Sequence, residues 1–402
     1  MDDRDVYPRI SALLDEYLQP LGMLQARGPL RALRELTRGI VFTCSVQLSN
    51  AARLWAGNPR QLQHAVERLS EHLADPHWDH REWAAAVLRL QAEAIEEDDL
   101  IPIDPTELAK PYARHMQYQC TVRDASRVGD PLVQGYWCFG GYHWQPDHSC
   151  LSALMLRPYS QNQPGFRSEN ALFGRWFWTL REATSGRGIW LLDRGGDRPE
   201  ILADLLRVQP RWIVRLREDR GLIGPGGWRH PAGYWADWAL AHRPERGRAV
   251  TLPVGLPPED VPQFGPAPPL WLVVPTYTFG HNERWVLLTC GLVDQHTGPR
   301  QIRRCYALRW RAEDGKRFLG QLWHVERFLT QSFLALERML WCVVLASGFV
   351  ALLQRDYPRL RDQLQREVLY HEKPFKIPAC RLARGLQSVA IRHLGVAMLN
   401  NA

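Results

Sequence analysis

The sequence has few cysteines, and they lack the spacing of a disulfide framework or a zinc site. Its eight cysteines are scattered along the chain, with no C-x-x-C pair and no cysteine–histidine cluster. This pattern argues against a zinc-ribbon protein and against a small disulfide-stapled one. We therefore expect reduced, mostly buried thiols in a cytosolic protein.

The sequence also lacks a segment suited to a membrane. Residues 1–5 are acidic and do not show the charged-then-apolar order of a signal peptide. The longest uncharged run free of proline, residues 339–354, is shorter than the ~20 residues needed to cross a bilayer, and it contains Ser347 and Gly348. We interpret this run as a core helix and expect no membrane partner.

No internal repeat and no phosphate-binding loop is visible. Gly135, Gly140 and Gly141 are not followed by a helix that carries Lys-Ser/Thr, so we expect no nucleotide cofactor there.

The charge balance is compatible with a polyanionic partner but does not require one. Fifty basic residues against 43 acidic ones give a formal net charge of +7 over 402 residues. Ordinary solubility would explain the same balance. The length is sufficient for two to four structural units with a substantial core.

Hydrophobic periodicity divides the chain into regions of different character. Helical spacing dominates up to about residue 95, where Asn58-Pro59 is typical of a helix start. The pattern then predicts strands at 100–104, 117–124, 133–144 and 150–156, a helix at 168–184, a strand at 188–193, a helix at 199–208 and a strand at 211–217. Residues 218–298 are broken by glycine and proline and predict an all-β insertion. Helix resumes from about Pro299 and continues to about 353.

Three acidic residues stand in positions that suggest a shared site. Asp104 and Asp193 each end a strand-like apolar run, at 100–103 and 189–192. In the later helical region Tyr306, Arg309 and Glu313 have the offsets 0, +3 and +7, which places them on one helical stripe. Acids at the carboxyl ends of strands and on a helix could converge on metal ions.

At these residues the chain resembles the cut-and-paste DDE transposases of bacterial insertion sequences, in the branch with a Y-(2)-R-(3)-E-(6)-K signature. The resemblance covers roughly residues 98–355. The segment 193–197 is similar to the second-aspartate motif, 212–215 to the strand that follows it, and 285–289 to the tryptophan strand of hairpin-forming members. One position departs from the signature: Gly320 stands where the lysine is expected, and Lys316 and Arg317 are the nearest cations.

The resemblance, together with the order of the elements, implies an α/β fold with a ribonuclease-H-like mixed sheet. In this interpretation residues 1–95 form a helical DNA-end-binding region, and residues 218–298 are the all-β insertion. The catalytic core comprises 96–217 and 299–355, and 356–402 form a C-terminal appendix. The stretch 49–60 is a candidate turn of a helix-turn-helix, and a plain helical bundle is the alternative.

The resemblance implies two-metal phosphodiester chemistry at the three acids. Asp104, Asp193 and Glu313 would be the catalytic ligands of two Mg²⁺ ions, for which Mn²⁺ could substitute. Each acid has a structural alternative: a turn or cap at Asp104, and a surface ion pair of Glu313 with Lys316 or Arg317. Asp197 is the rival of Asp193, and we assign metal binding to Asp193 and capping of the next helix to Asp197.

The resemblance also implies DNA-binding roles for cations and aromatic residues. Tyr306 and Arg309 would contact phosphates beside the scissile bond, and Lys316 or Arg317 would take the place of the missing lysine. Trp285 would stack on a base pulled out of the helix, and Arg215 would line the DNA channel. The alternatives are core packing for Tyr306 and Trp285 and a surface position for Arg215.

These expectations describe a DNA transposase that hydrolyses transposon ends and then transfers the strand to target DNA. Its partners would be double-stranded DNA, namely terminal inverted repeats and target, and a second copy of the chain in a synaptic complex. It would be cytoplasmic and nucleoid-associated in a bacterium. Three alternatives remain: a transposase-derived DNA-binding regulator without cleavage, a structure-selective nuclease of the same fold, and, more distantly, a glycosidase built on two of the carboxylates.

Overall fold

The computed structural model divides the chain into two compact units, each of which combines segments distant in the sequence. The sheet unit comprises Ile95–Asp104 and Arg167–Ala312, and the helical unit comprises Met1–Ala94, Pro105–Phe166 and Glu313–Ala402. The structure describes residues 6–125, 127–242, 249–260, 268–276, 284–293, 298–368 and 378–395.

The predicted N-terminal helices are present in the helical unit. They are α1 (Val6–Leu18), α2 (Gly28–Thr43), α3 (Leu48–Ala52), α4 (Pro59–Ala74) and α5 (Arg81–Ala92). Asn58 caps α4 as predicted, because its Oδ1 accepts a hydrogen bond from the Gln61 amide at 2.9 Å and Pro59 occupies the first turn. The predicted turn of a helix-turn-helix falls at the end of α3 and in the following loop, and its DNA-binding role stays a prediction.

Helix α11 (Phe333–Asp356) is the core of the helical unit and packs against α2 and β4. It is the single helix among the described residues that is long and apolar enough to span a membrane, but 83% of its apolar window is buried inside the protein. The prediction of a core helix at 339–354 is therefore confirmed. Two further helices follow, α12 (Pro358–Arg366) and α13 (Pro378–Leu394).

The strands of the helical unit are antiparallel. The second half of β1 (Leu100–Ala109) lies beside β3, since the Lys110 amide donates to the Gln134 carbonyl at 2.7 Å. β3 (Leu132–Gln145) pairs with both β2 (Cys120–Arg123) and β4 (Cys150–Tyr159). The bounds of β2, β3 and β4 are close to those of the predicted strands, but β1 continues to Ala109, so the predicted end of this strand at Asp104 is wrong.

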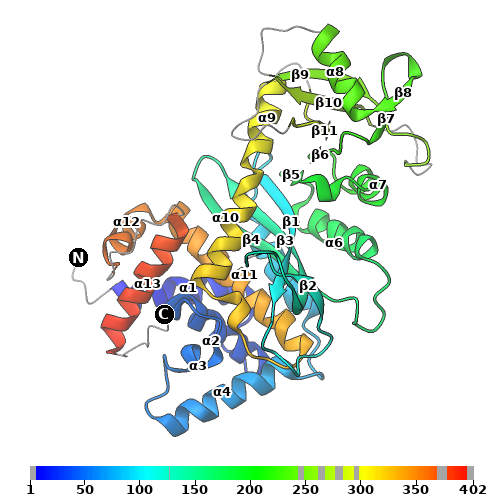
Figure 1. Cartoon of the computed structure of the whole chain (residues 1–402). Helices are drawn as coiled ribbons and strands as arrows, with labels where there is room; N and C mark the ends of the chain where they lie inside the picture. The colour runs from blue at the N-terminus through cyan, green and yellow to red at the C-terminus, as the bar shows by residue number, and fades with distance from the viewer. Residues whose placement is uncertain are drawn as a thin grey trace. The chain divides into compact units, whose positions relative to one another are not determined.

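In the sheet unit, the first half of β1, β5 (Ile189–Leu192) and β6 (Trp212–Arg215) are neighbouring parallel strands. Helices α6 (Glu169–Thr184) and α7 (Pro199–Val208) connect and cover them, and Phe177 of α6 packs on Trp190 of β5 with ring centroids 5.4 Å apart. Figure 1 shows α6 and α7 together at one side of these strands. The fold is therefore mixed α/β, and the helix–strand order from 168 to 217 agrees with the prediction.

The prediction of an all-β insertion at 218–298 is wrong, because α8 (Ala232–His242) is a helix of this region. Its longer strands also extend the main sheet: β11 (Leu287–Cys290) pairs with β6, and β10 (Leu270–Pro275) pairs with both β11 and β9 (Ala249–Val254). The short β7 (Gly221–Ile223) and β8 (Arg229–Pro231) form a separate hairpin. Alternation and turn residues predicted the strands, but they could not show which neighbours the strands would pair with.

The segment that carries the Tyr-Arg-Glu stripe begins at Pro299 as predicted but is not one regular α-helix. α9 (Pro299–Ala307) continues into a 3₁₀ turn, η5 (Leu308–Trp310), then α10 (Arg311–Arg317) and a π-helical turn, η6 (Phe318–Leu322). A second 3₁₀ turn, η7 (Val325–Arg327), precedes α11. These changes of helix type alter the phase of the side chains that follow, so the spacing rule of a regular helix does not apply as far as Gly320.

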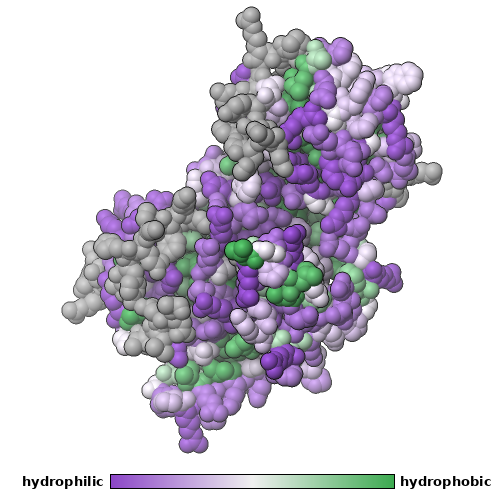
Figure 2. Space-filling view, viewed as in Figure 1, coloured by the Kyte–Doolittle hydropathy of each residue, from purple (hydrophilic) through white to green (hydrophobic). Residues whose placement is uncertain are grey.

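On the face that Figure 2 shows, hydrophilic residues predominate and apolar ones form separate small groups. All eight cysteines are free, and all except the half-buried Cys305 are buried, which confirms the expectation of mostly buried thiols.

Candidate functional site

Asp104 and Asp193 lie where the parallel pairing of β1 and β5 ends: β5 stops at Leu192, whereas β1 continues through Asp104 to Ala109. β1 and β5 are in register from Leu100↔Ile189 to Ile103↔Leu192, and each aspartate is the next residue of its chain. Neighbouring strands are ~4.8 Å apart and residues in register point to the same face. Asp104 is 6% exposed and Asp193 is half-buried. The sheet thus brings together two carboxylates that are 89 residues apart in the sequence.

The side chain of Asp193 also holds the turn that follows β5. Its Oδ1 accepts a hydrogen bond from the Gly195 amide at 2.7 Å and caps the 3₁₀ turn η3 (Arg194–Gly196). Asp193 has no cationic partner among the described residues. Asp193 Oδ1 therefore stabilises the turn, and this hydrogen bond also fixes the orientation of Oδ2.

The prediction that Asp197 caps the next helix is wrong. Arg198 occupies the N-cap position of α7 and makes no side-chain cap. Asp197 is instead 2% exposed, and it accepts hydrogen bonds from the Arg217 amide at 2.7 Å and from Arg220 Nε at 2.5 Å. Burial favours this arrangement because an ion pair with Arg220 satisfies a carboxylate that water cannot reach.

Arg309 is the cation next to Asp104. Its Nη1 lies 3.3 Å from Asp104 Oδ2, and the two side chains are 12% and 9% exposed. Arg309 reaches this position from the 3₁₀ turn η5, which follows α9, and α9 itself packs on β9 and β10. The structure therefore brings together the arginine of the stripe and the first acid.

Tyr306 is buried beneath this ion pair rather than exposed. It is 3% exposed, and its ring meets that of Trp285 edge to face, with centroids 5.2 Å apart. Burial raises the pKa of Tyr306 to about 12, although Arg309 and Arg215 act in the opposite direction. The phenol is therefore neutral at physiological pH, where it interacts with Arg309 by a hydrogen bond.

Arg215 and Trp285 lie at the same end of the sheet. Arg215 ends β6 and is paired in register with Leu287 of β11, two residues after Trp285. Both side chains are half-buried. Arg215 acts on the pKa of Tyr306 in the same direction as Arg309, and the Trp285 ring packs against the Tyr306 ring. Arg215, Trp285 and Arg309 therefore form one cluster around Tyr306.

Glu313 belongs to the helical unit, where it pairs with a lysine. Lys316 Nζ lies 3.4 Å from Glu313 Oε1 and 3.4 Å from the carbonyl oxygen of Pro105, the residue that follows Asp104 in the chain. The ion-pair alternative for Glu313 is thus realised with Lys316, and Arg317 is exposed. The helix approaches the strands closely here, because a Cβ at Gly315 would come within 2.7 Å of the Tyr142 ring.

The donor chemistry of the site suits a hard divalent cation. Carboxylate oxygens are the ligands that Mg²⁺ prefers, and it retains several waters, so two or three carboxylates are sufficient. Among the described residues, no group of three or more histidine, cysteine, aspartate or glutamate side chains forms a ready-made cage. The sheet unit by itself therefore offers Asp104 and Asp193, and a role for Glu313 stays a prediction.

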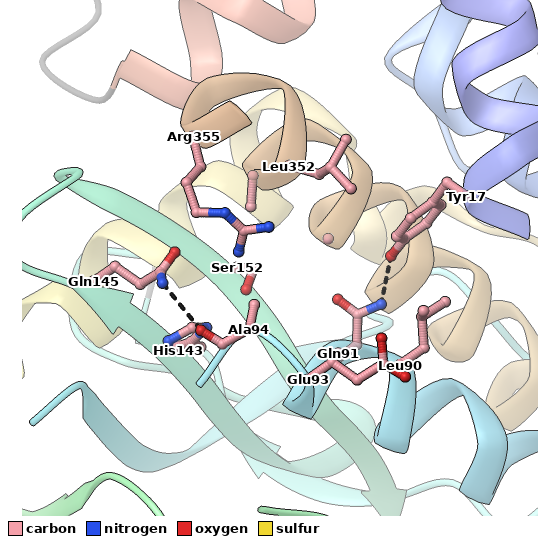
Figure 3. Close-up of a pocket in the computed structure, with 12 residues that line it drawn as sticks. Tyr17, Leu90, Gln91, Glu93, Ala94, His143, Gln145, Ser152, Leu352 and Arg355 are labelled. Carbon is pink, nitrogen blue, oxygen red and sulfur yellow. Dashed lines mark hydrogen bonds between the residues drawn. The ribbon is translucent and has the colours of Figure 1, made fainter. Parts of the chain in front are cut away.

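A polar pocket in the helical unit has a different character. It has a volume of 220 Å³ and is lined by residues of α1, α5, β3, β4 and α11. Figure 3 shows that Gln91 donates to the Tyr17 hydroxyl and Gln145 to the Ala94 carbonyl, so these polar groups bind one another. The volume is below the ~300 Å³ of typical ligand sites, and water would fill such a space.

Sequence reasoning missed two buried charged groups. Arg220 is 8% exposed and joins Asp197 to Asp260, whose Oδ2 lies 3.3 Å from Arg220 Nη1. Lys110 is 4% exposed and donates from Nζ to the carbonyls of Phe328 and Glu326. No local signal marks either residue, since their partners lie far away in the sequence.

No protein-family model matches the sequence, and no curated protein is similar to it. A solved cryo-EM structure described as "piggyBac transposase synaptic complex with hairpin DNA" aligns with 99% of this chain and 82% of that chain. The TM-score is 0.48 and the sequence identity is 10%. At that level the similarity carries no argument about the activity of this chain.

Proposed function

We propose that the protein is a DDE-type DNA transposase. The observation that carries the proposal is the pair Asp104 and Asp193, which follow the last paired residues of the parallel strands β1 and β5, with Arg309 at 3.3 Å from Asp104. The sequence resemblance had assigned metal binding to these two acids and phosphate binding to this arginine. Residues that a DNA-cleaving site needs together are thus neighbours in the sheet unit.

The fold supports a ribonuclease-H-like assignment for the core. Along the chain, β1 is followed by the antiparallel β3 and β4, and then by β5 and β6, which run parallel to β1 with α6 and α7 as connections. That is the order of strands and helices from which the ribonuclease-H-like fold was predicted. Asp104 and Asp193 stand where the parallel pairing ends, the edge at which α/β sheets place their sites.

Two Mg²⁺ ions, for which Mn²⁺ could substitute, would activate the attacking oxygen and stabilise the leaving oxygen of the phosphodiester. In the proposal Asp104, Asp193 and Glu313 hold them. Asp104 is ordered by its position within β1, and Asp193 by the hydrogen bond from the Gly195 amide. Such pre-ordering reduces the loss of side-chain freedom on binding.

The DNA backbone would be bound by the cations around these acids. Arg309 suits a phosphate because its fork can grip two oxygens, and the buried Tyr306 would orient it by a hydrogen bond. Arg215, Lys316 and Arg317 would extend the contact along the strand. Trp285 would stack on an extruded base after it turns from the edge of Tyr306, which favours a hairpin route.

The test is cleavage of DNA that carries the sequences flanking the coding region, which the proposal expects to contain inverted repeats. Asp104→Asn, Asp193→Asn and Glu313→Gln should each lower Mg²⁺- or Mn²⁺-dependent cleavage at least about a hundredfold, because each removes a metal ligand. Binding of the same DNA should remain. Asp204→Asn, on α7 beside Arg207, is the control that leaves cleavage intact. Undiminished cleavage by one of the three variants would remove that residue from the site.

A DNA-binding regulator without cleavage is the second candidate, and Gly320 favours it because the signature lysine is missing there. The wild type would then bind terminal DNA without nicking it in either metal. A nuclease that nicks DNA but yields no strand-transfer product would instead identify the third candidate, a structure-selective enzyme.

A further inference from the structure

Two acids that we propose as metal ligands are each held by a cation that we propose as a DNA ligand. In the sheet unit Arg309 Nη1 lies 3.3 Å from Asp104 Oδ2. In the helical unit Lys316 Nζ lies 3.4 Å from Glu313 Oε1. In each unit, therefore, a proposed metal ligand forms an ion pair with a proposed DNA-binding cation.

We propose that Arg309 and Lys316 take the place of the metal cations in the DNA-free protein, and that they block metal binding to Asp104 and Glu313 until DNA binds. In the DNA-free protein they neutralise the carboxylates. DNA phosphates then draw the two side chains away, and a divalent metal binds tightly to the vacated carboxylates. This inference rests on the proposed function and adds its regulation: strong metal binding requires DNA.

The burial of the Arg309–Asp104 pair explains why a substitute is needed. The two side chains are only 12% and 9% exposed, so water cannot compensate the Asp104 charge and an unpaired carboxylate there would be costly. A guanidinium supplies one positive charge and hydrogen-bond donors in the place that a divalent ion would otherwise take. Because both compete for the same oxygen, and because they repel each other at short range, the metal must displace the arginine.

A DNA phosphate is a suitable alternative partner for the released arginine. Arginine grips phosphate with two parallel hydrogen bonds, as it does carboxylate, so the exchange replaces one ion pair with another of similar strength. The exchange removes the Arg309 charge from Asp104 at the moment when the metal is needed. By thermodynamic reciprocity, metal must strengthen DNA binding by the same factor by which DNA strengthens metal binding.

Asp193 differs from Asp104 and Glu313. Its Oδ1 is bound by the uncharged Gly195 amide, and it makes no ion pair with a described residue. The device therefore acts at two of the three acids.

The test measures Mn²⁺ affinity of the DNA-free protein by electron paramagnetic resonance of the free ion. Arg309→Gln should bind Mn²⁺ about tenfold more tightly than the wild type, because the competing guanidinium is gone. Lys316→Gln should have a smaller effect, about twofold, since that pair is 20% and 36% exposed and is weakened by solvent. Arg309→Lys retains the charge and should stay near the wild-type affinity.

Arg304→Gln is the matched control. It removes the same single charge from α9, which precedes Arg309, but Arg304 is exposed and makes no ion pair with a described residue. Its Mn²⁺ affinity should change less than twofold, which separates direct competition from the general effect of net charge. Circular dichroism checks that each variant is folded, and Lys316→Gln keeps the test valid if Arg309→Gln does not fold.

The second arm adds a generic DNA duplex at low salt. Saturating duplex should tighten Mn²⁺ binding of the wild type about tenfold, and this gain should largely disappear in Arg309→Gln. Unchanged or weaker DNA-free Mn²⁺ binding in both Arg309→Gln and Lys316→Gln would overturn the inference. If Asp104→Asn still abolished Mn²⁺ binding in that case, the proposed metal site would stand. Unaffected Mn²⁺ binding by Asp104→Asn would refute the proposed site itself.

Discussion

Replacing Asp197 by asparagine should destabilise the sheet unit by about 3 kcal/mol. The change removes the charge but keeps the shape of a side chain whose Oδ1 lies 2.5 Å from Arg220 Nε and whose Oδ2 accepts from the Arg217 amide. An asparagine NH₂ would face the donors of Arg220, so one buried donor loses its acceptor. Breaking a buried ion pair from one side typically costs 3–5 kcal/mol.

The lower end of that range applies because Arg220 keeps a second partner. Asp260 Oδ2 lies 3.3 Å from Arg220 Nη1, and the Asp197 carbonyl also accepts from Arg220. The side chains of Arg220 and Asp197 are 7% and 0% exposed, so solvent screens the loss little. Arg220→Met should cost a similar amount, and the double variant should cost less than the sum by about 2 kcal/mol, which is their coupling energy.

Urea unfolding followed by circular dichroism measures these costs. With a slope of about 1–3 kcal/mol per molar urea, the midpoint of the sheet-unit transition should fall by about 1–3 M. Hydrogen exchange of peptides that contain β5 and β6 should accelerate to match, whereas α11 of the helical unit should keep its protection. Glu259→Gln, which breaks the exposed pair with Arg229, is the control and should leave the midpoint unchanged.

A midpoint for Asp197→Asn within about 0.2 M of the wild type would refute the argument that this ion pair supports the sheet unit. Additive costs in the double variant would show that Asp197 and Arg220 act separately. Mn²⁺ affinity gives an independent check, because Asp197 is assigned to the fold and Asp193 to the metal. Folded Asp197→Asn should therefore still bind Mn²⁺.

Two further predictions concern Gly320 and Lys110. A Cβ at Gly320 would meet nothing within 4 Å, so a lysine should fit there. Gly320→Lys should raise the free energy of unfolding by about 0.5–1 kcal/mol, because it restricts the unfolded backbone, and should tighten DNA binding in a filter assay. A lower urea midpoint would contradict the predicted gain in stability. Burial lowers the pKa of Lys110 to about 7, whereas the unfolded chain keeps that proton up to about pH 10.4, so the unfolded state binds more protons between these values. The stability of the wild type relative to Lys110→Met should therefore rise from pH 7 to 10 in urea titrations, and a difference that does not change with pH would disprove it.

Local patterns predicted the features that depend on neighbouring residues. The Asn58 cap depends on a contact three residues away, and the start of α9 at Pro299 depends on the proline ring, so both could be read from a few letters. The strands before Asp104 and Asp193 were visible because apolar residues fill both runs, but the continuation of β1 to Ala109 was not predicted. Their close approach was a hypothesis until the parallel register of β1 and β5 was seen.

Features that depend on distant partners could not be predicted. Asp197 looked like a helix cap because Pro199 follows it, but its partner Arg220 is 23 residues away and becomes a neighbour only when β5 and β6 pair. The 3₁₀ turn at Leu308–Trp310 has no breaker in its sequence; it lies where the segment leaves the support of β9 and β10. Helix α8 was missed because glycine and proline on either side suggested strands and turns.

The sequence alone determined which residue types were available and which elements would form. It showed acids that follow apolar runs, and a helical segment with tyrosine, arginine and glutamate at close spacing. These depend on short-range periodicity and on steric preferences of single residues. The tertiary structure alone decided that Arg309 would neutralise Asp104, that Asp197 would be buried against Arg220, and that segments remote in the chain would share a unit. Such pairings are set by strand register and by the need to neutralise buried charge. Neither can be predicted from a short segment of the sequence, because both depend on residues far apart in the chain.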